Sequence, residues 1–598
     1  MKKRILWLGL SFLVVAALVL ASCAKEEVVT PTTPTTPTMP TTPTTPTTPT
    51  VPAAGEPVYG GTLTFALAGR ANQADPQGPD LMDGGRSQLD FQQAFLENPI
   101  WGDFEKYGPR GTNEVPLLLR PTCPIEYCTT GLLESWEMDD TQITWHVRPG
   151  IYWRGTNGAR KVMEDRELTA DDFAAWLLYY RACPAEAVFK AATTDKIIAT
   201  DRYTVEIPLT AGYNTSLIWL AGYEDRALVM PPEILGSDTW EDMVGTGPFI
   251  FKEYVRGSFM SFTRNPNYWG TTTINGKEYE IPFVDELVYP IIPDYDTQIA
   301  ALRTGKLDFM DSVTVTYWAS LDTTAPELES RRYVSTGVTS VGFRNDIAPF
   351  NNIEVRKALM IGTDIRAFRA LIKSGKIQLP LNPWPFYAED PYYYTPLEEL
   401  PPEIQSLYSY NPTLARQMLT AQGIPTGFKI VLEMTPGDQT VVALLKDQWT
   451  KIGIDLQIVL EEYAVLWAKT GTANKTYTQA IFAGWESGDP VSMLSAWVRT
   501  GARQNDCVYN NPTVDALIDE MNASRDRAEQ KSLAKEALTI MRDDVPMIPL
   551  QSGTQAHFWW PWLKNYYGEV NVADWCNTMP IMACTWIDQD MKADMGFK

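Results

Sequence analysis

The chain has 598 residues, with 73 acidic and 50 basic side chains and a formal net charge of −23 at pH 7. So acidic a surface argues against nucleic acid or an anionic bilayer as the main partner. The 2 histidines, His146 and His557, lie far apart in the sequence, which leaves little material for histidine-based metal sites or catalytic triads. We therefore predict no metal, no cofactor and no nucleic-acid partner, and the length predicts two or three lobes.

The N-terminus carries an export signal. Basic residues at Met1–Arg4 precede an almost wholly apolar run over Ile5–Leu20, which is too short to span a membrane. The following Leu20–Cys23 resembles the lipobox of bacterial lipoproteins, in which the cysteine receives a diacylglycerol. We predict a signal peptide over 1–22 and a lipid anchor on Cys23 that holds the body outside the cytoplasmic membrane. A plain secretory signal with an incidental cysteine is the alternative.

A low-complexity tract of Pro-Thr-Thr repeats runs from Thr30 to Pro52. Proline and threonine favour an extended polyproline II conformation with too little apolar area to collapse. At about 3.1 Å per residue the tract would reach on the order of 70 Å. We predict that 23–57 is a linker between the lipidated cysteine and a folded body. The sequence of that body contains no second apolar stretch long enough for a membrane span.

The body opens with alternating strand and helix patterns. Thr62–Leu67 alternates like a strand, and a helix is expected over 87–96. The segment 132–151 predicts two strands joined by a turn and ended by Pro-Gly. Thr169 is expected to cap a helix that runs to about 182, and a hairpin follows over 197–207. The N-terminal part of the body is therefore predicted to combine antiparallel hairpins with helices.

The later part of the body alternates helices with short strands. Gly305 and Gly423 each follow a helical pattern and are expected to end it. Strands that alternate with helices indicate α/β lobes with mixed sheets. The predicted helices are 296–304, 352–360, 413–421, 440–452 and 514–542, and the predicted strands are 307–309, 428–434 and 454–459.

The cysteines after Cys23 are even in number, which favours disulfides in an exported chain. Two pairs lie close together in the sequence and are the natural local bridges. A long-range bridge would then be left for the remaining two cysteines. The predicted local pairs are Cys123 with Cys128 and Cys576 with Cys584, and the remaining two are Cys183 and Cys507.

A series of short segments resembles, in the same chain order, the extracytoplasmic solute-binding proteins of oligopeptide and dipeptide ABC importers, bacterial family 5. Each segment is weak evidence alone, whereas their order over almost the whole body makes the resemblance strong. The segments are Gly60–Leu63, Trp145–Ile151, Leu168–Asp172, Gly245–Phe249, Arg264–Trp269, Ala301–Asp308, Val355–Leu359 and Trp485–Pro490.

The resemblance implies an α/β, two-lobed periplasmic-binding-protein-like fold with mixed sheets and an extra subdomain inserted in lobe one. In such proteins the lobes close about a hinge and enclose the ligand. Carried onto this chain, lobe one takes 58–95, 200–290 and 540–598, the inserted subdomain takes 95–200, and lobe two takes 290–540.

The resemblance also implies a ligand-binding strand. Peptide binders of the family pair a strand of lobe two with the peptide main chain, and the matching positions here are Gly484, Trp485 and Glu486. The interval from Trp485 to Pro490 is shorter than in those binders, so the aspartate that meets a peptide's ammonium group is displaced. Glu486 and Asp489 are the acids that remain there. Core packing is the alternative role for Trp485.

Three further residues are candidate ligand contacts. Arg344 is placed to meet a ligand carboxylate, with a surface arginine as the alternative, and Arg70 follows the first strand, where relatives touch their ligand. Trp467 belongs to a set of 20 tryptophans. Because indole faces stack on sugars, this set raises an oligosaccharide-binding relative as the alternative to a peptide binder.

We therefore expect a monomeric binding protein without catalytic residues, which delivers an oligopeptide-like or other medium-sized solute to the permease and ATPase subunits of an ABC importer. An extracellular glycoside hydrolase that uses paired carboxylates is the enzymatic alternative, but so acidic a sequence always offers such a pair. A surface protein that kept the fold for sensing or adhesion, without a transporter, is a third possibility.

Overall fold

The structure of the protein is a computed structural model. The residues that it describes belong to one compact unit, Val51–Lys598. The predictions for Cys23, Arg70, Glu486 and Cys576 lie outside the described residues. The residues described are 55–66, 89–115, 117, 123–183, 186–224, 227–237, 239–371, 395–436, 439–471, 475–485, 489–569, 571–573 and 578–597.

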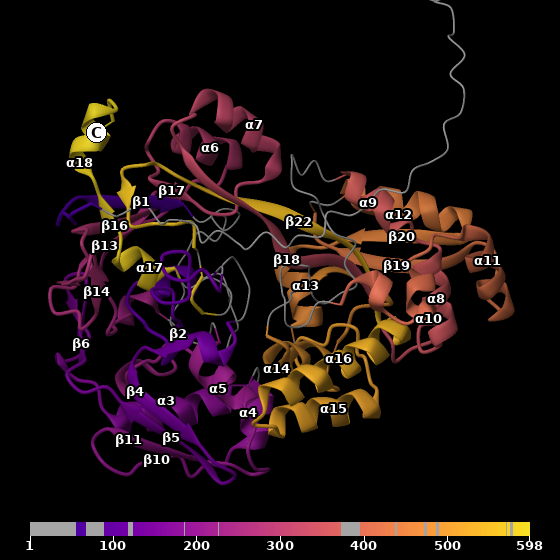
Figure 1. The fold of residues 1–598 in the computed structure, drawn as a ribbon, viewed down its shortest axis with the longest axis horizontal. Helices are drawn as coiled ribbons and strands as arrows, with labels where there is room; N and C mark the ends of the chain where they lie inside the picture. Colours follow the sequence, from indigo (N-terminus) through magenta and orange to yellow (C-terminus); the bar gives the residue numbers. More distant parts are fainter. Residues whose placement is uncertain are drawn as a thin grey trace, which may run out of the picture. The chain divides into compact units, whose positions relative to one another are not determined.

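A ten-stranded mixed sheet runs through the body (Figure 1). Its inner parallel pairs join β1 to β16 and β17, and β19 to β20 and β21, whereas the other pairs are antiparallel. In spatial order the strands are β12 (Phe249–Val255), β13 (Phe259–Arg264), β16 (Glu286–Pro290), β1 (Thr62–Ala66), β17 (Phe309–Met310), β22 (Met547–Trp559), β18 (Glu329–Phe343), β21 (Ala480–Trp485), β19 (Phe428–Met434) and β20 (Ile454–Leu460).

The two longest strands, β18 and β22, connect two separate halves of the body. They pair antiparallel from Glu329 opposite Trp559 to Gly342 opposite Met547. One end of β18 packs in a first hydrophobic core through Tyr333, and the other packs in a second core through Phe343. We call the residues of the first core the first lobe, and those of the second and third cores the second lobe. The model therefore has the two-lobed architecture that the sequence predicts.

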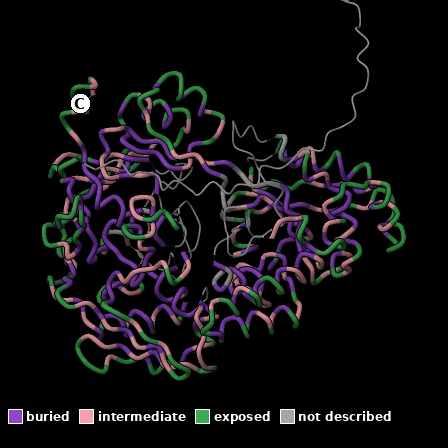
Figure 2. Tube along the Cα trace, viewed as in Figure 1, coloured by how far each residue is buried: buried purple, intermediate pink, exposed green. Residues whose placement is uncertain are grey.

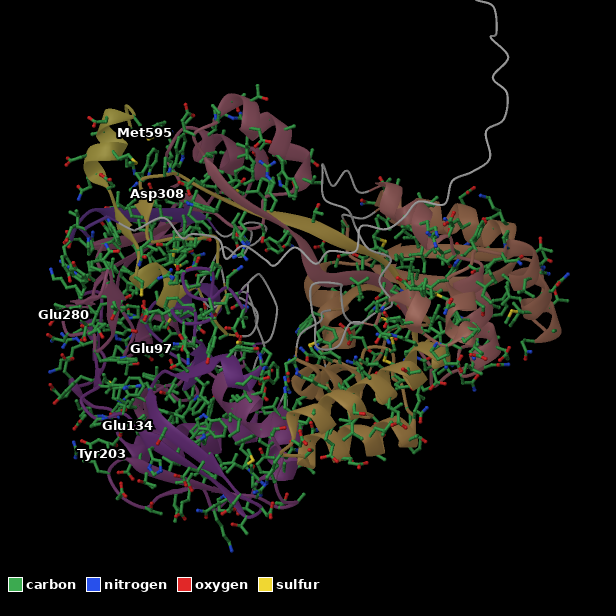
Figure 3. The ribbon with its side chains drawn as sticks, in the orientation of Figure 1. Glu97, Glu134, Tyr203, Glu280, Asp308 and Met595 are labelled. Carbon is green, nitrogen blue, oxygen red and sulfur yellow. The ribbon has the colours of Figure 1, made fainter. Side chains whose placement is uncertain are left out.

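The first lobe is rich in buried aromatic side chains, of which Trp560 and Trp562 stack with ring centroids 4.5 Å apart. It includes residues 299–325, which the sequence prediction assigned to lobe two. Asp308, labelled in Figure 3, is fully buried and accepts hydrogen bonds from Trp562 Nε1 at 2.7 Å and Lys592 Nζ at 2.8 Å. These contacts tie the C-terminal segment to the central sheet.

The inserted subdomain contains a four-stranded sheet in the order β10-β11-β5-β4, covered by helix α3. The elements are β4 (Leu133–Met138), β5 (Gln142–Val147), α3 (Ala170–Ala182), β10 (Ile198–Ala199) and β11 (Thr204–Pro208). Thr169 caps α3 through a capping box with Asp172, as expected from the sequence. The two hairpins predicted around this helix are therefore confirmed as one antiparallel sheet.

The second lobe packs helices against β19, β20 and β21, around the buried Trp449. A third core lies between helices α15 and α16 and the strand ends. Figure 2 shows this division into buried interiors and an exposed rim. The helices are α8 (Ile353–Ile361), α9 (Ile365–Leu371), α10 (Pro402–Leu407), α11 (Pro412–Ala421), α12 (Gln439–Lys451), α13 (Tyr463–Thr470), α14 (Pro490–Met493), α15 (Pro512–Ala523) and α16 (Arg527–Asp544).

The described ranges contain no helix with the length and apolar character of a membrane span, and no cluster of three or more acidic, histidine or cysteine side chains arranged to hold a metal.

The remaining elements belong to the first lobe. The remaining helices are α2 (Leu89–Gln92), α4 (Ala187–Ala192), α5 (Ser216–Ile218), α6 (Tyr295–Arg303), α7 (Val315–Thr324), α17 (Met579–Ala583) and α18 (Gln589–Asp594), and the smaller strands are β2 (Ile100–Gly102), β3 (Cys128–Thr130), β6 (Tyr152–Trp153), β7 (Thr156–Asn157), β8 (Arg160–Lys161), β9 (Arg166–Glu167), β14 (Thr271–Ile274), β15 (Lys277–Glu280), β23 (Leu563–Lys564) and β24 (Trp586–Ile587).

Candidate functional site

Strand β21 is paired along its whole length on one side and only at its start on the other. Its residues from Ala480 to Trp485 all lie opposite residues of β18 in the pairing register. On the opposite side β19 pairs only with Ala480 and Ile481. Among the strands that the structure describes, the segment from Phe482 to Trp485 therefore has no partner on this second side.

The main-chain groups of Gly484 point to the unpaired side. The Arg344 N–H donates to the Gln479 carbonyl at 2.9 Å, and Ser340 Oγ donates to the Ala483 carbonyl at 3.1 Å. The N–H and C=O groups of the odd-numbered residues of β21 are thus directed toward β18. Because successive residues of a strand direct their N–H and C=O groups to opposite sides, Phe482 and Gly484 face away from it. Gly484 is exposed, and a Cβ atom built on it would meet no atom within 4 Å.

The parallel strands β19, β20 and β21 end at the same edge of the sheet, at Met434, Leu460 and Trp485. Ligands of open α/β sheets bind outside the carboxyl ends of such strands. Two large apolar side chains are exposed near this edge, since Leu460 is 51% and Val465 is 48% exposed. The open end of β21 and this apolar surface form the candidate ligand site. The sequence analysis missed both apolar residues, although their place just after an alternating strand was visible.

A buried charged group supports the same edge. Glu433, 2% exposed, accepts hydrogen bonds from Lys469 Nζ at 2.7 Å and from the Thr478 N–H at 2.6 Å. Burial alone would raise the pKa of Glu433, but the hydrogen bonds from Lys469 and Thr478 outweigh it and lower that pKa. Lys469 also contacts Glu461 at 2.6 Å. These pairs hold α13 against the ends of β19 and β20.

Asp489 is engaged within the protein. It is 8% exposed, forms an ion pair with Arg527, and accepts a hydrogen bond from the Val491 N–H at 3.1 Å at the start of α14. In this arrangement the carboxylate stabilises the helix start and the arginine. It does not project toward the open edge beside Gly484 as a lone charge.

Arg344 also uses its donors within the protein. Two nitrogens contact the Asp346 carboxylate at 2.7 Å each, and NH1 donates to the carbonyls of Lys475 and Tyr477 at 3.1 and 3.0 Å. The ion pair lowers the pKa of Asp346. Arg344 therefore anchors the segment before β21 to the end of β18.

Trp467 lies on α13, where the two lobes approach one another. The guanidinium of Arg503 lies 6.0 Å from its ring centroid, and the same guanidinium lies 3.9 Å from the Glu224 carboxylate of the first lobe. Glu224 is buried and accepts a hydrogen bond from Tyr180 at 2.7 Å. A Cβ on Gly471 would lie 2.7 Å from the Trp467 ring, so the turn after α13 requires glycine at this point.

Of the two predicted local cysteine pairs, the one that lies wholly within the described residues is not bonded in the structure. Cys123 and Cys128 are free thiols, and Cys128 Sγ lies 3.6 Å from the Pro124 carbonyl and 3.8 Å from that of Cys123. Cys128 also lies beside the buried Cys123 thiol, and burial first and then the interaction with Cys123 raise the pKa of Cys128. Cys507 and Cys584 are also free thiols. The predicted Cys123–Cys128 bridge is therefore corrected to a pair of thiols.

A buried carboxylate of the first lobe bears on the enzymatic alternative. Glu97, labelled in Figure 3, accepts hydrogen bonds from Thr246, Tyr268 and Trp269 at 2.7, 2.8 and 3.2 Å. Its burial raises the pKa of Glu97. Like Asp308, it is surrounded by protein donors, so the structure gives both acids a structural role.

Comparison with known proteins places these features in a family. The family model described as bacterial extracellular solute-binding proteins, family 5 Middle, matches residues 128–505. The chain is 28% identical over 456 residues to heme-binding protein A of Haemophilus influenzae, covering 70% of this chain and 78% of that protein. It is 26% identical over 463 residues to di/tripeptide-binding protein 1 of Pseudomonas aeruginosa, covering 71% and 80%.

Solved structures show the same fold. The periplasmic binding protein DppA of Helicobacter pylori, in complex with the peptide STSA, superposes with a TM-score of 0.66 at 21% identity over 87% of this chain and 99% of that one. The oligopeptide-binding protein AppA of Bacillus subtilis, in complex with a nonapeptide, gives 0.67 at 17% identity over 89% and 100%. The chain therefore belongs to family 5 of the bacterial extracellular solute-binding proteins.

Proposed function

We propose that this protein captures an extended, peptide-like solute between its lobes, by main-chain pairing with β21, and delivers it to an ABC importer. The observation that carries the proposal is the side of β21 where no described strand pairs with Gly484, toward which its N–H and C=O groups are directed. Relatives named as di/tripeptide-binding and dipeptide-binding proteins support a peptide as the solute.

Main-chain pairing accounts for the weak demand on side chains at this strand. An added strand takes its affinity from N–H and C=O groups and its specificity from the side-chain surfaces beside it. Each such hydrogen bond contributes a net of about 0.5–1.5 kcal/mol. The exposed Leu460 and Val465 would then receive an apolar side chain of the solute.

The charged ends of the solute need partners other than the two that the structure has engaged. Asp489 pairs with Arg527, and Arg344 pairs with Asp346. Glu486 follows the open end of β21 in the sequence and is the acid that we propose for the solute's ammonium group. Arg70 is proposed for a carboxylate, since in the sequence it comes shortly after the last residue of β1.

We also propose that the protein catalyses no reaction on the solute. Its relatives in Haemophilus influenzae and Pseudomonas aeruginosa are named as binding proteins, and the buried acids Glu97 and Asp308 are surrounded by protein donors. Solute would shift the population of open and closed forms through contacts made only when the lobes meet. An oligosaccharide remains the alternative solute, but many tryptophans that suggested it are fully buried, among them Trp145, Trp449 and Trp562.

A thermal-shift screen of the mature chain against di- to hexapeptides and matched oligosaccharides tests this function. At a hundredfold excess over Kd, binding to the folded state adds about 2.7 kcal/mol to the free energy of unfolding. Stabilisation by peptides is the expected result. Stabilisation by oligosaccharides alone would overturn the peptide assignment and place half-buried indoles such as that of Trp467 at the solute.

A further inference from the structure

The two lobes touch at a second place, away from the crossing strands β18 and β22. The N–H of Thr215, next to α5 of the first lobe, donates to the Asn522 carbonyl of α15 at 3.1 Å. Gln530 Nε2 on α16 reaches the Thr215 hydroxyl at 3.5 Å. Figure 1 shows α5 beside the helices α14, α15 and α16. The junction between α15 and α16 is therefore a contact that opening of the lobes would break.

Arg527, the first residue of α16, lies at the centre of this contact. Its Nε is 3.0 Å from Glu126. Glu126 is the middle residue of a short 3-10 helix, Ile125–Tyr127, in the first lobe. The NH2 group of Arg527 pairs with Asp489 of the second lobe, and NH1 contacts Gln530 at 3.1 Å. One guanidinium thus joins acids from both lobes.

The acid on the second lobe lies close to the candidate ligand site. Asp489 is at the start of α14, and the chain reaches α14 directly from the open end of β21. A solute that pairs with Gly484 would therefore bind close in the chain to the acid that orients Arg527. The Asp489 carboxylate holds Arg527 in the orientation that meets Glu126.

We infer that Arg527 is a positioning residue that couples the seating of solute on β21 to closure of the lobes, with Asp489 orienting its guanidinium and Glu126 receiving it in the closed form. The inference rests on the proposed function for its solute, but the contact between Arg527 and Glu126 is present in the structure and can be tested without solute. Arginine suits this role because its planar group presents several donors in a rigid geometry, whereas lysine offers a single ammonium.

A neighbouring pair provides the matched control. Arg525 contacts Asp140 of the first lobe at 2.8 Å, and its guanidinium lies 4.6 Å from the ring of Tyr213. The side chains of Arg525 and Asp140 are 57% and 77% exposed, against 24% and 37% for Arg527 and Glu126. Exposed pairs contribute little. Arg525 also crosses between the lobes but has no recorded contact with Asp489.

The first test measures the radius of gyration of the ligand-free mature chain by small-angle X-ray scattering. Glu126→Gln removes the contact across the lobes and leaves the Asp489–Arg527 pair, so we expect a larger radius and an unchanged melting temperature. Arg525→Gln should leave the radius unchanged. In about 1 M salt the difference between Glu126→Gln and the unmodified chain should shrink, because screening weakens the contact. Equal radii for all three proteins, or equal increases in both variants, would overturn the inference.

The second test adds a peptide identified by thermal shift. We expect Glu126→Gln and Arg527→Lys each to bind it three- to tenfold more weakly and to contract less on binding, whereas Arg525→Gln should behave as the unmodified chain. Unchanged affinity and full contraction in Glu126→Gln would contradict the coupling while leaving peptide binding intact. Failure of every peptide to bind would contradict the proposed function, but the ligand-free scattering result would still decide the closure contact.

Discussion

His557 is a wholly buried histidine in the first core, on strand β22. Its ring lies 5.0 Å from that of Tyr333, and its Nδ1 accepts a hydrogen bond from the Ser312 N–H at 3.4 Å. Burial, followed by the positive charge of Arg331, lowers the pKa of His557 to about 3. The folded protein thus holds this side chain neutral under mildly acidic conditions.

This burial predicts a loss of stability in acid. The unfolded chain binds a proton at His557 below about pH 6.5, whereas the folded chain does not until about pH 3, so stability from this residue is complete above pH 6.5 and falls as the pH is lowered toward 3. Between pH 7 and pH 5 the loss amounts to about 2 kcal/mol. Urea unfolding at both pH values should show a smaller difference for His557→Gln. If His146→Gln reduced the change in stability between pH 7 and pH 5 as much as His557→Gln does, the assignment to His557 would be wrong.

Two candidate ligand residues show the limit of sequence reasoning at this scale. The sequence names Arg344 and Asp489 as candidate ligand contacts, and the structure shows both engaged within the protein. Their partners come from distant segments, since Arg344 contacts the carbonyls of Lys475 and Tyr477, and Asp489 contacts Arg527. Because an arginine or aspartate satisfied by the protein has the same letter as one aimed at a solute, only the three-dimensional contacts distinguish them.

At the scale of single elements, the unpaired side of β21 predicts that one substitution of Gly484 weakens solute binding and that another leaves it nearly unchanged. Gly484→Pro removes the N–H that faces the open side, and proline is tolerated where a strand N–H has no partner in the sheet. Gly484→Ala keeps that N–H and adds a Cβ where no atom lies within 4 Å.

We expect Gly484→Pro to weaken peptide binding at least fivefold, the equivalent of about 1 kcal/mol for a lost hydrogen bond. Gly484→Ala should bind within about twofold of the unmodified chain, and calorimetry measures both. Retained affinity in the proline variant, with an intact fold by circular dichroism, would show that the solute does not pair with Gly484.

The C-terminus of α16 predicts a contrast between two neighbouring side chains. Arg356 is 6% exposed and donates to the carbonyls of Asp544, Val545 and Phe350 at 2.6–3.0 Å. Lys357 forms a partly exposed ion pair with Asp543 at 2.7 Å. Arg356 therefore donates to the carbonyls of Asp544 and Val545 at the end of α16, where a helix offers no donor of its own.

We expect Arg356→Ala to destabilise the protein by about 3 kcal/mol, because it leaves buried carbonyls unpaired. Lys357→Ala should cost less than about 1 kcal/mol. Denaturant unfolding followed by tryptophan fluorescence reports both changes. Similar losses in the two variants would mean that Arg356 contributes through its charge and not through these carbonyls.

The helices also show which element features are local. The predicted helices over 352–360 and 413–421 match α8 and α11, since Asn352 and Asn411 cap them and the apolar period is clear. The single helix predicted over 514–542 is instead α15 and α16. The chain is extended at Ser524, and Asp526 caps the second helix by accepting from the Ala528 N–H at 2.8 Å. Cap chemistry inside an otherwise helical pattern decided the break.

At the scale of the whole molecule, the described body has no helix suited to a membrane span, and proteins of this family are extracytoplasmic. We propose that Cys23 anchors it through a lipid. The Cys23→Ser variant, expressed in the native host, should move from the membrane fraction to the soluble extracytoplasmic fraction, whereas Cys128→Ser should stay with the membrane. Membrane association of both variants would contradict lipid attachment at Cys23.

By itself the sequence determined the α/β class of fold and the order of the elements, because these depend on local patterns of apolar, turn and capping residues, whereas the export signal stays a prediction. Its short motifs also indicated the family and the strand ending at Trp485. Only the tertiary structure decided that residues 299–325 pack in the first core and that Arg527 joins acids of both lobes. These outcomes depend on contacts between segments far apart in the chain, which no local pattern encodes.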